Sequence, residues 1–164
     1  MCSFFRMVLQ ETYEVYDCFI IDKCTQLDHA NWSNTDKFSW ANNKCTITTS
    51  TSIFPRIATR ITGDFEATFK AKNNLVRLTT YNADNPSQQR MWNMPETNDE
   101  LYYKINRRNG VWTAQSSSDG VTWTNLQERT DDVDLTTEDV YFGFIIATSS
   151  ERSITFHDLI VYFI

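Results

Sequence analysis

The strongest constraint on the fold of this chain is a pair of tight turns, Asn109-Gly110 and Asp119-Gly120, which lie close together in the sequence. Asn-Gly and Asp-Gly supply the positive φ angles that two-residue hairpin loops require. Strand-forming residues flank both turns, with Trp112-Thr113-Ala114 between them and Val121-Thr122-Trp123 after them. The sequence therefore predicts a three-stranded antiparallel meander over roughly residues 101–108, 111–117 and 121–128.

The rest of the chain continues as short strands. Phe65, Ala67, Phe69 and Ala71 alternate with polar residues, which places these four on one face of a strand. Aromatic residues make up 14% of the 164 residues, and rings fill the space between two packed sheets well. Further strands are predicted near residues 38–40, 44–50, 53–61, 75–81, 89–93, 140–148 and 153–164. With no helical period, linker or repeat, we predict one all-β domain over residues 23–164.

Residues 1–22 form a separate apolar segment without a clean period. We predict either an edge strand that completes a sheet or an N-terminal arm that docks on a neighbouring subunit of an oligomer. No run approaches the about 20 apolar residues of a membrane helix, and the start does not resemble a signal peptide. We therefore expect synthesis in the cytoplasm and no membrane partner.

The four cysteines, Cys2, Cys18, Cys24 and Cys45, all lie in the first third of the chain. Their spacing does not match a zinc site, and without a secretion signal we expect free thiols. A bridge between Cys18 and Cys24 is the alternative. The net charge of −6 disfavours nucleic acid, whose phosphates would be repelled.

Several motifs, taken in order, resemble the concanavalin A-like lectin/glucanase jelly-roll superfamily, especially its laminin-G-like and DUF1349-like branches. The resemblance covers about residues 24–164 and rests on Leu27-Asp28-His29-Ala30-Asn31-Trp32, Gly63-Asp64-Phe65-Glu66, Ser117-Ser118-Asp119-Gly120-Val121-Thr122-Trp123, Tyr141-Phe142-Gly143-Phe144 and Ile154-Thr155-Phe156-His157-Asp158. It implies an antiparallel jelly-roll sandwich of two sheets with a concave face that often binds glycans. Arg152 and His157 depart from the family pattern, so ligand positions there are not carried over.

Catalysis is not expected from this sequence. The glucanases of the superfamily that this sequence resembles use paired acids in an E-x-D-x-x-E strand. The nearest acids here, Glu11, Glu14 and Asp17, have a different spacing. Neither His29 nor His157 belongs to a recognisable nucleophile arrangement. We therefore predict a protein that is not an enzyme and assign no catalytic residues.

An acidic stretch near the C-terminus raises the question of calcium. It contains oxygen ligands of the kind that calcium prefers, and similar proteins often hold calcium at sheet rims. The EF-hand order is missing, and acidic loops are commonly just solvated. We assign no metal or cofactor and keep calcium as the alternative for Asp131, Asp132, Asp134, Glu138 and Asp139.

Sugar binding requires an aromatic platform beside hydrogen-bonding side chains, because pyranose rings present C–H faces and hydroxyl edges. The residues that fit are on strands that the resemblance would place on one sheet, namely Arg77, Tyr81, Arg90, Trp92, Tyr102 and Lys104. Tyr102 and Lys104 lie on the polar face of their alternation. The alternative is that Trp92 and Tyr102 are core or interface aromatics. Trp32, Trp40, Trp112 and Trp123 are expected in the core.

The function that follows is a non-catalytic recognition module, which binds carbohydrate or a cell-surface receptor and is displayed on a virion or another extracellular assembly. The alternative is a purely structural virion component, such as a decoration, fibre or tail protein, in which the jelly roll is only a building block.

Overall fold

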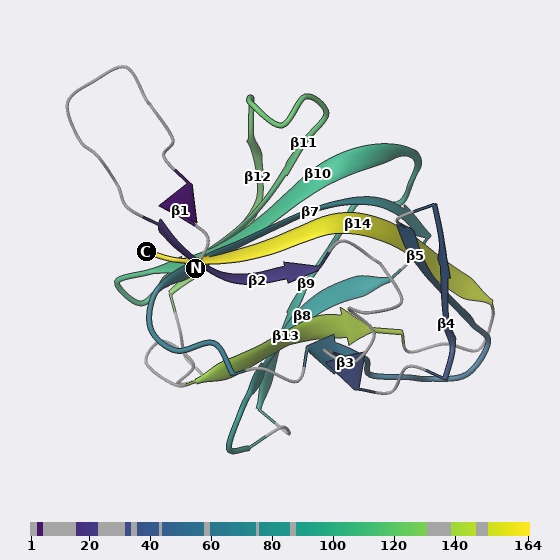
Figure 1. Ribbon diagram of the computed structural model, residues 1–164, viewed down its shortest axis with the longest axis horizontal. Helices are drawn as coiled ribbons and strands as arrows, with labels where there is room; N and C mark the ends of the chain where they lie inside the picture. Colours follow the sequence, from purple (N-terminus) through teal and green to yellow (C-terminus); the bar gives the residue numbers. More distant parts are fainter. Residues whose placement is uncertain are drawn as a thin grey trace.

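The computed structural model describes residues 3–4, 16–22, 32–33, 36–42, 44–57, 60–74, 76–85, 88–130, 139–146 and 151–164. In these ranges every regular element is a β-strand, and all pairings between strands are antiparallel. The strands form two sheets, one above the other in Figure 1. The predicted all-β sandwich of two antiparallel sheets is confirmed.

Within the described ranges, the larger sheet has nine strands. Its main path runs β1 (Ser3–Phe4), β2 (Tyr16–Asp22), β14 (Arg152–Phe163), β7 (Phe65–Asn74), β10 (Thr97–Arg108), β11 (Val111–Ser117) and β12 (Thr124–Thr130). Two further strands, β4 (Phe38–Ala41) and β5 (Lys44–Thr49), join it because β5 also pairs with β14. Figure 1 shows β14, β7 and β10 as long curved strands side by side.

The described part of the smaller sheet has five strands, in the order β3 (Trp32–Ser33), β6 (Arg56–Ile57), β13 (Val140–Ile145), β8 (Arg77–Asn82) and β9 (Gln89–Trp92). β13 carries the glycine of the Tyr141-Phe142-Gly143-Phe144 motif. A Cβ at Gly143 would lie 2.3 Å from the carbonyl oxygen of Pro55, so the backbones of β13 and the residues before β6 approach too closely for any side chain.

Strand β14 contains a β-bulge at Asp158. β5 pairs with its first part, up to Phe156, and β2 pairs with its second part, from Leu159. Between them, His157 pairs with Lys70 of β7, whereas Ile160 pairs with Thr68, so β14 has one extra residue there. Asp158 has a φ of 52°, the positive value typical of such a residue.

The core between the sheets is aromatic, as the composition predicts. Phe65, Ala67, Phe69 and Ala71 are all buried, which confirms the alternation predicted for this strand. The ring of Phe69 stacks on Tyr103 and meets other rings of the core edge-on. Cys45, the cysteine whose side chain is described, is a buried free thiol.

The predicted meander is present as β10, β11 and β12, but its two turns differ. Asn109 and Gly110 both have positive φ, as a two-residue hairpin turn requires. Asp119-Gly120 instead belongs to a longer loop, residues 118–123, and β12 begins at Thr124 rather than at residue 121. The tight turn predicted there is wrong because Asp119 binds backbone amides further along the loop.

The N-terminal strands β1 and β2 extend the larger sheet beyond β14. A role for residues 1–22 in contacts between subunits stays a prediction. Among the described residues, no helix has the length and apolar character needed to cross a membrane.

Candidate functional site

The six residues predicted to bind a ligand are divided between the two sheets. Arg77 and Tyr81 lie on β8, and Arg90 and Trp92 lie on β9, both in the smaller sheet; Tyr102 and Lys104 lie on β10 in the larger sheet. The expected arrangement on one sheet is therefore wrong. The physical reason is that the segment between β9 and β10 crosses from one sheet to the other, although all three strands are consecutive in the sequence.

Trp92 is a core residue, the alternative that the sequence left open. Its side chain is 0% exposed and stacks on Trp112, with 5.8 Å between ring centroids. Arg90, two residues earlier on the same side of β9, is also buried. These positions contradict a surface platform at Trp92, because no part of the indole is accessible to a ligand.

On β8, the other two predicted residues are separated from β10. Tyr81 is buried, and its hydroxyl donates a hydrogen bond to the carbonyl oxygen of Phe144 at 3.3 Å. Burial raises the pKa of Tyr81, because the charged phenolate would be desolvated. Arg77 is exposed on the smaller sheet, with its Nη1 3.8 Å from Met91 Sδ. Neither side chain joins Tyr102 and Lys104.

Tyr102 and Lys104 lie on the outer side of β10, as the alternation predicts, whereas their neighbours Tyr103 and Ile105 point into the core. The ammonium group of Lys70, on β7, lies 4.9 Å from the centroid of the Tyr102 ring. Tyr102 and Lys70 are directly paired in the sheet. Together with its cationic neighbours, Tyr102 forms a partly exposed aromatic site on the larger sheet.

Trp123 is also on this side of the molecule. Its ring lies over the ammonium group of Lys104, at 4.2 Å, and is partly exposed. Lys104 also lies 3.8 Å from the carboxylate of Glu66. The prediction that Trp123 is a core residue is wrong because the loop that carries it is longer than a tight turn and folds over the outer side of β10. Trp112 is in the core as predicted.

Asp119 fixes the shape of this loop. Its Oδ1 accepts hydrogen bonds from the amides of Val121 and Thr122, at 2.8 and 2.7 Å, and from the hydroxyl of Ser117 at 2.8 Å. These bonds, led by that from Thr122, lower the pKa of Asp119 well below its usual range. Gly120 lies against Tyr102, where a Cβ would be 3.3 Å from Cζ of the ring. The loop thus places Trp123 on the same side of β10 as Tyr102 and Lys104.

A cluster of ionic groups surrounds Glu100 on the same surface. Its carboxylate pairs with Lys44 of β5 and lies 3.6 Å from Lys70 Nζ and 3.5 Å from His157 Nε2. The hydrogen bond from Lys44 is the main reason that the pKa of Glu100 is lowered. His157 Nδ1 contacts Asp158 Oδ2 at 2.8 Å. We call Glu100, Lys44, Lys70 and His157 the Glu100 cluster.

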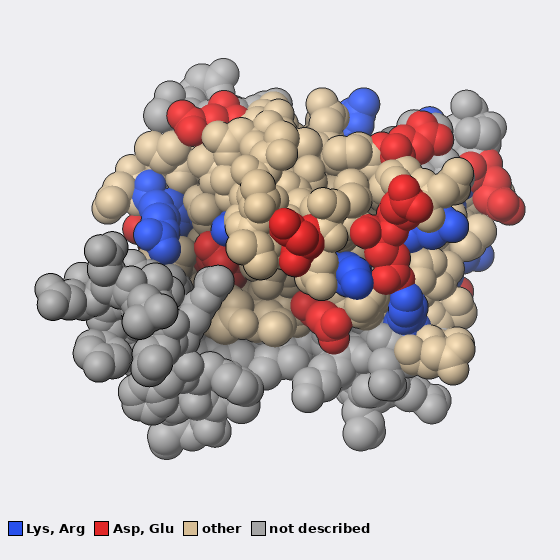
Figure 2. Space-filling model, turned by 90° about the horizontal axis from the view of Figure 1, so that it is seen from above, with Lys and Arg blue, Asp and Glu red and all other residues tan. Residues whose placement is uncertain are grey.

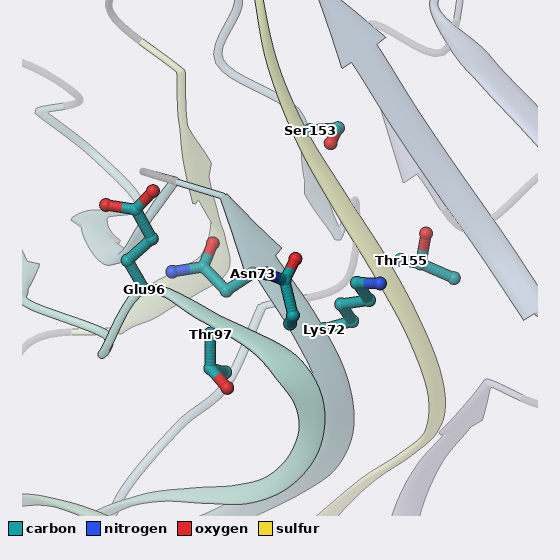
Figure 3. A pocket seen from close by; sticks show the side chains of 7 residues that line it. Lys72, Asn73, Glu96, Thr97, Ser153 and Thr155 are labelled. Carbon is teal, nitrogen blue, oxygen red and sulfur yellow. The ribbon is translucent and has the colours of Figure 1, made fainter.

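A polar pocket of about 520 Å³ opens next to this cluster, where the end of β7 meets the starts of β10 and β14 (Figure 3). Asn73 is buried at its base, where its amide nitrogen donates to the carbonyl oxygen of Pro95 at 3.2 Å. This bond holds the segment before β10 against β7. The other lining residues are Lys72, Glu96, Thr97, Asn98, Ser153 and Thr155.

The pocket, the Glu100 cluster, Tyr102, Lys104 and Trp123 together form what we call the outer face. Figure 2, which looks from above onto the molecule of Figure 1, shows basic and acidic side chains interspersed on one surface. Such a surface offers aromatic rings for C–H groups and many donors and acceptors for hydroxyl groups. The alternation of residues 64–71 already placed Lys70 on a polar side, but no sequence signal brought Lys44, Glu100 and His157 together.

Calcium at the acidic stretch of residues 131–139 stays a prediction. Residues 131–138 lie outside the described part of the chain. Asp139 is described, and its carboxylate lies 3.7 Å from Arg60 Nη1. Within the described ranges, no three or more His, Cys, Asp or Glu side chains are arranged to hold a metal ion.

No protein-family model matches the sequence, and no curated protein sequence matches it. The structure, however, is similar to a LamA variant from Z. galactanivorans in complex with laminaritriose and laminaritetraose, with a TM-score of 0.64 and 8% identity over 88% of this chain and 98% of that chain. It is also similar to the exoplasmic/lumenal domain of VIP36 in its Ca²⁺/Man3GlcNAc-bound form, with a TM-score of 0.59 and 10% identity over 83% and 86%. The fold is a concanavalin A-like jelly-roll sandwich.

A third similar structure is the CBM2 module of the evolved Dit of Lactobacillus casei BL23 phage J-1. Its TM-score is 0.52 and its identity 14%, over 77% of this chain and 78% of that chain. At these identities the likeness shows the fold alone. The predicted jelly-roll architecture is therefore confirmed, and membership of the superfamily and of its laminin-G-like or DUF1349-like branch stays a prediction.

Proposed function

We propose that this protein is a non-catalytic carbohydrate-binding module that binds its ligand on the outer face of the larger sheet. The observation that carries this proposal is the placement of two partly exposed aromatic rings, Tyr102 and Trp123, beside charged and hydroxyl side chains and a polar pocket. Sugar rings bind to such surfaces because aromatic rings cover their C–H faces while polar groups bind their hydroxyls.

The comparisons give independent support. Two proteins of the same fold, the LamA variant and VIP36, are described with bound oligosaccharides, and the third is described as a CBM2 module. Their sequences differ too much to transfer binding residues. For this chain, the site therefore rests on its own outer face.

The charges on the outer face support binding over hydrolysis. Glycosidases of the common two-carboxylate type need a carboxyl group with a raised pKa, which protonates the leaving oxygen. Glu100 has a lowered pKa because Lys44 binds its carboxylate, and Glu66 lies beside Lys104. A general acid is therefore not favoured at Glu100. Incubation with laminarin-type and mannose-type oligosaccharides should release no new reducing ends.

The test of the binding site compares Tyr102→Ala and Trp123→Ala with Tyr141→Ala on a panel of immobilised glycans. Tyr141 is a matched control, because it is a partly exposed tyrosine beneath a cation, Arg56 at 4.8 Å, but lies on the smaller sheet. We expect the first two variants to lose at least about tenfold in affinity, equivalent to about 1.4 kcal/mol, and the control to bind normally. Equal loss in all three variants would contradict the assignment to the outer face.

We further propose that the module is displayed on a larger assembly, such as a virion or a cell surface, with residues 1–22 providing contacts to neighbouring subunits. One protein of the same fold, the CBM2 module of the evolved Dit, belongs to a phage. A purely structural role remains the competing proposal. Light scattering on the full chain and on a chain without residues 1–15 tests the contacts, since a multimer that dissociates on truncation is expected. A multimer that binds no glycan would favour the structural role.

A further inference from the structure

The pocket on the outer face contains one positive and one negative side chain, and neither is neutralised within it. No ion pair joins Lys72 or Glu96 to another residue in the described part of the chain. Figure 3 shows the two side chains on different sides of the pocket, with Thr155 near Lys72. A ligand that fills the pocket therefore meets an ammonium group at one side and a carboxylate at the other.

Positive charge extends from Lys72 along the outer face. Lys70 and Lys72 are two residues apart on β7 and point to the same side, which separates them by about 7 Å. Lys70 shares the single carboxylate of Glu100 with Lys44, and His157 lies against it as well. Two lysines thus share one carboxylate at Glu100, while the Asp158 carboxylate lies on the far side of His157, 2.8 Å from its Nδ1.

The lowered pKa of Glu100 is a second indication that the lysines on this face stabilise a negative charge. A carboxylate at this position is stabilised in its ionised form, mainly because Lys44 donates to it. Lys72 lies next to this cluster and is exposed, so its charge is available to a ligand. The hydroxyl of Thr155 lies opposite Lys72 across the β14–β7 pair and is held by Thr46 Oγ1 at 2.9 Å.

We propose that the ligand of this site is an acidic glycan, in which a sugar with a carboxylate group occupies the pocket. Its carboxylate binds Lys72, and its hydroxyl groups bind Glu96 at the opposite side. Glu96 repels a carboxylate and accepts hydroxyl hydrogens, so the pocket orients the sugar. This inference rests on the carbohydrate-binding function proposed above and specifies its ligand class.

The experiment uses the full chain and matched probes. Oligogalacturonate is compared by calorimetry with the same oligosaccharide after its carboxyl groups are reduced to neutral alcohols, and sialyllactose is compared with lactose. We expect at least one acidic probe to bind about tenfold more tightly than its neutral partner. The advantage should shrink as the concentration of a 1:1 salt rises from about 0.05 to about 0.5 M, a tenfold increase in ionic strength, because exposed charges are screened.

Two variants locate the effect. Lys72→Met should remove the preference for the acidic probe, and Lys72→Arg should restore most of it. Arg77→Met is the matched control, since Arg77 is an exposed cation on the smaller sheet, and it should bind as the unmodified protein does. Melting curves confirm that each variant is folded.

The outcomes separate this inference from the proposed function. If neutral and acidic probes bind equally and Lys72→Met changes nothing, the acidic specificity is wrong while carbohydrate binding stands. If Arg77→Met alone abolishes the preference, the site is on the other sheet. If no probe of either kind binds, the acidic specificity is overturned, and the panel of immobilised glycans then decides whether carbohydrate binding stands.

Discussion

Replacing Trp92 tests whether this residue belongs to the core or to a binding surface. Its side chain is 0% exposed and stacks on Trp112 at 5.8 Å with 28° between the ring planes. Removing a buried tryptophan leaves a cavity and typically costs about 3–5 kcal/mol. In a chain of this size, about 2–4 °C of melting temperature corresponds to each kcal/mol, so Trp92→Ala should melt roughly 6–20 °C lower.

The assay is guanidinium unfolding followed by tryptophan fluorescence and by circular dichroism, with coincident transitions as the check for two-state behaviour. Trp123→Ala is the control, because this tryptophan is partly exposed and should cost about 1 kcal/mol or less. Trp92→Phe keeps an aromatic ring in the core and should retain glycan binding. A Trp92→Ala protein that is as stable as Trp123→Ala would refute the core assignment, and so would a folded Trp92→Phe that has lost its ligand.

Three further changes have defined outcomes. Gly143→Ala should lower the free energy of unfolding by about 1–3 kcal/mol in denaturant titrations, since its Cβ would lie 2.3 Å from Pro55 O. An unchanged free energy of unfolding would mean that β13 and the residues before β6 move apart at little cost. Asp119→Ala should lower the melting temperature at neutral pH, and the difference should shrink as the pH falls below about 4, because a carboxylate with a lowered pKa stabilises only while ionised. Burial raises the pKa of Tyr103 to about 12. As the pH rises, the hydroxyl of Tyr103 therefore ionises in the unfolded chain before it ionises in the folded protein, and the free energy of unfolding should fall from about pH 10 to 12. Tyr103→Phe, measured by unfolding across this range, should flatten that decline, and an unchanged slope would contradict it.

Much of the architecture was predictable because it depends on local pattern. The alternation of Phe65, Ala67, Phe69 and Ala71 identified a core face, and Asn109-Gly110 identified a hairpin, since both signals lie within a few consecutive residues.

The candidate site was less predictable because it depends on which sheet each strand joins. Arg90 and Tyr102 lie on strands that follow each other in the sequence, yet those strands belong to different sheets. The same limit applies to Glu100, which meets Lys44 and His157 only because β5 and β14 pair with each other. Trp123 was misplaced for a local reason, since the hydrogen bonds of Asp119 widen a loop that its Asp-Gly sequence would make tight.

The bulge at Asp158 has a consequence for how this strand tolerates changes in length. Phe156 and Leu159 both point into the core, and His157 and Ile160 do not, so the inward and outward alternation would be continuous if Asp158 were absent. Position 158 is therefore a place where β14 can lose one residue without exchanging its two faces. Elsewhere in the strand, a single insertion would turn every following core residue toward solvent. Related chains could thus differ in length at this position while the core and the outer face both keep their composition.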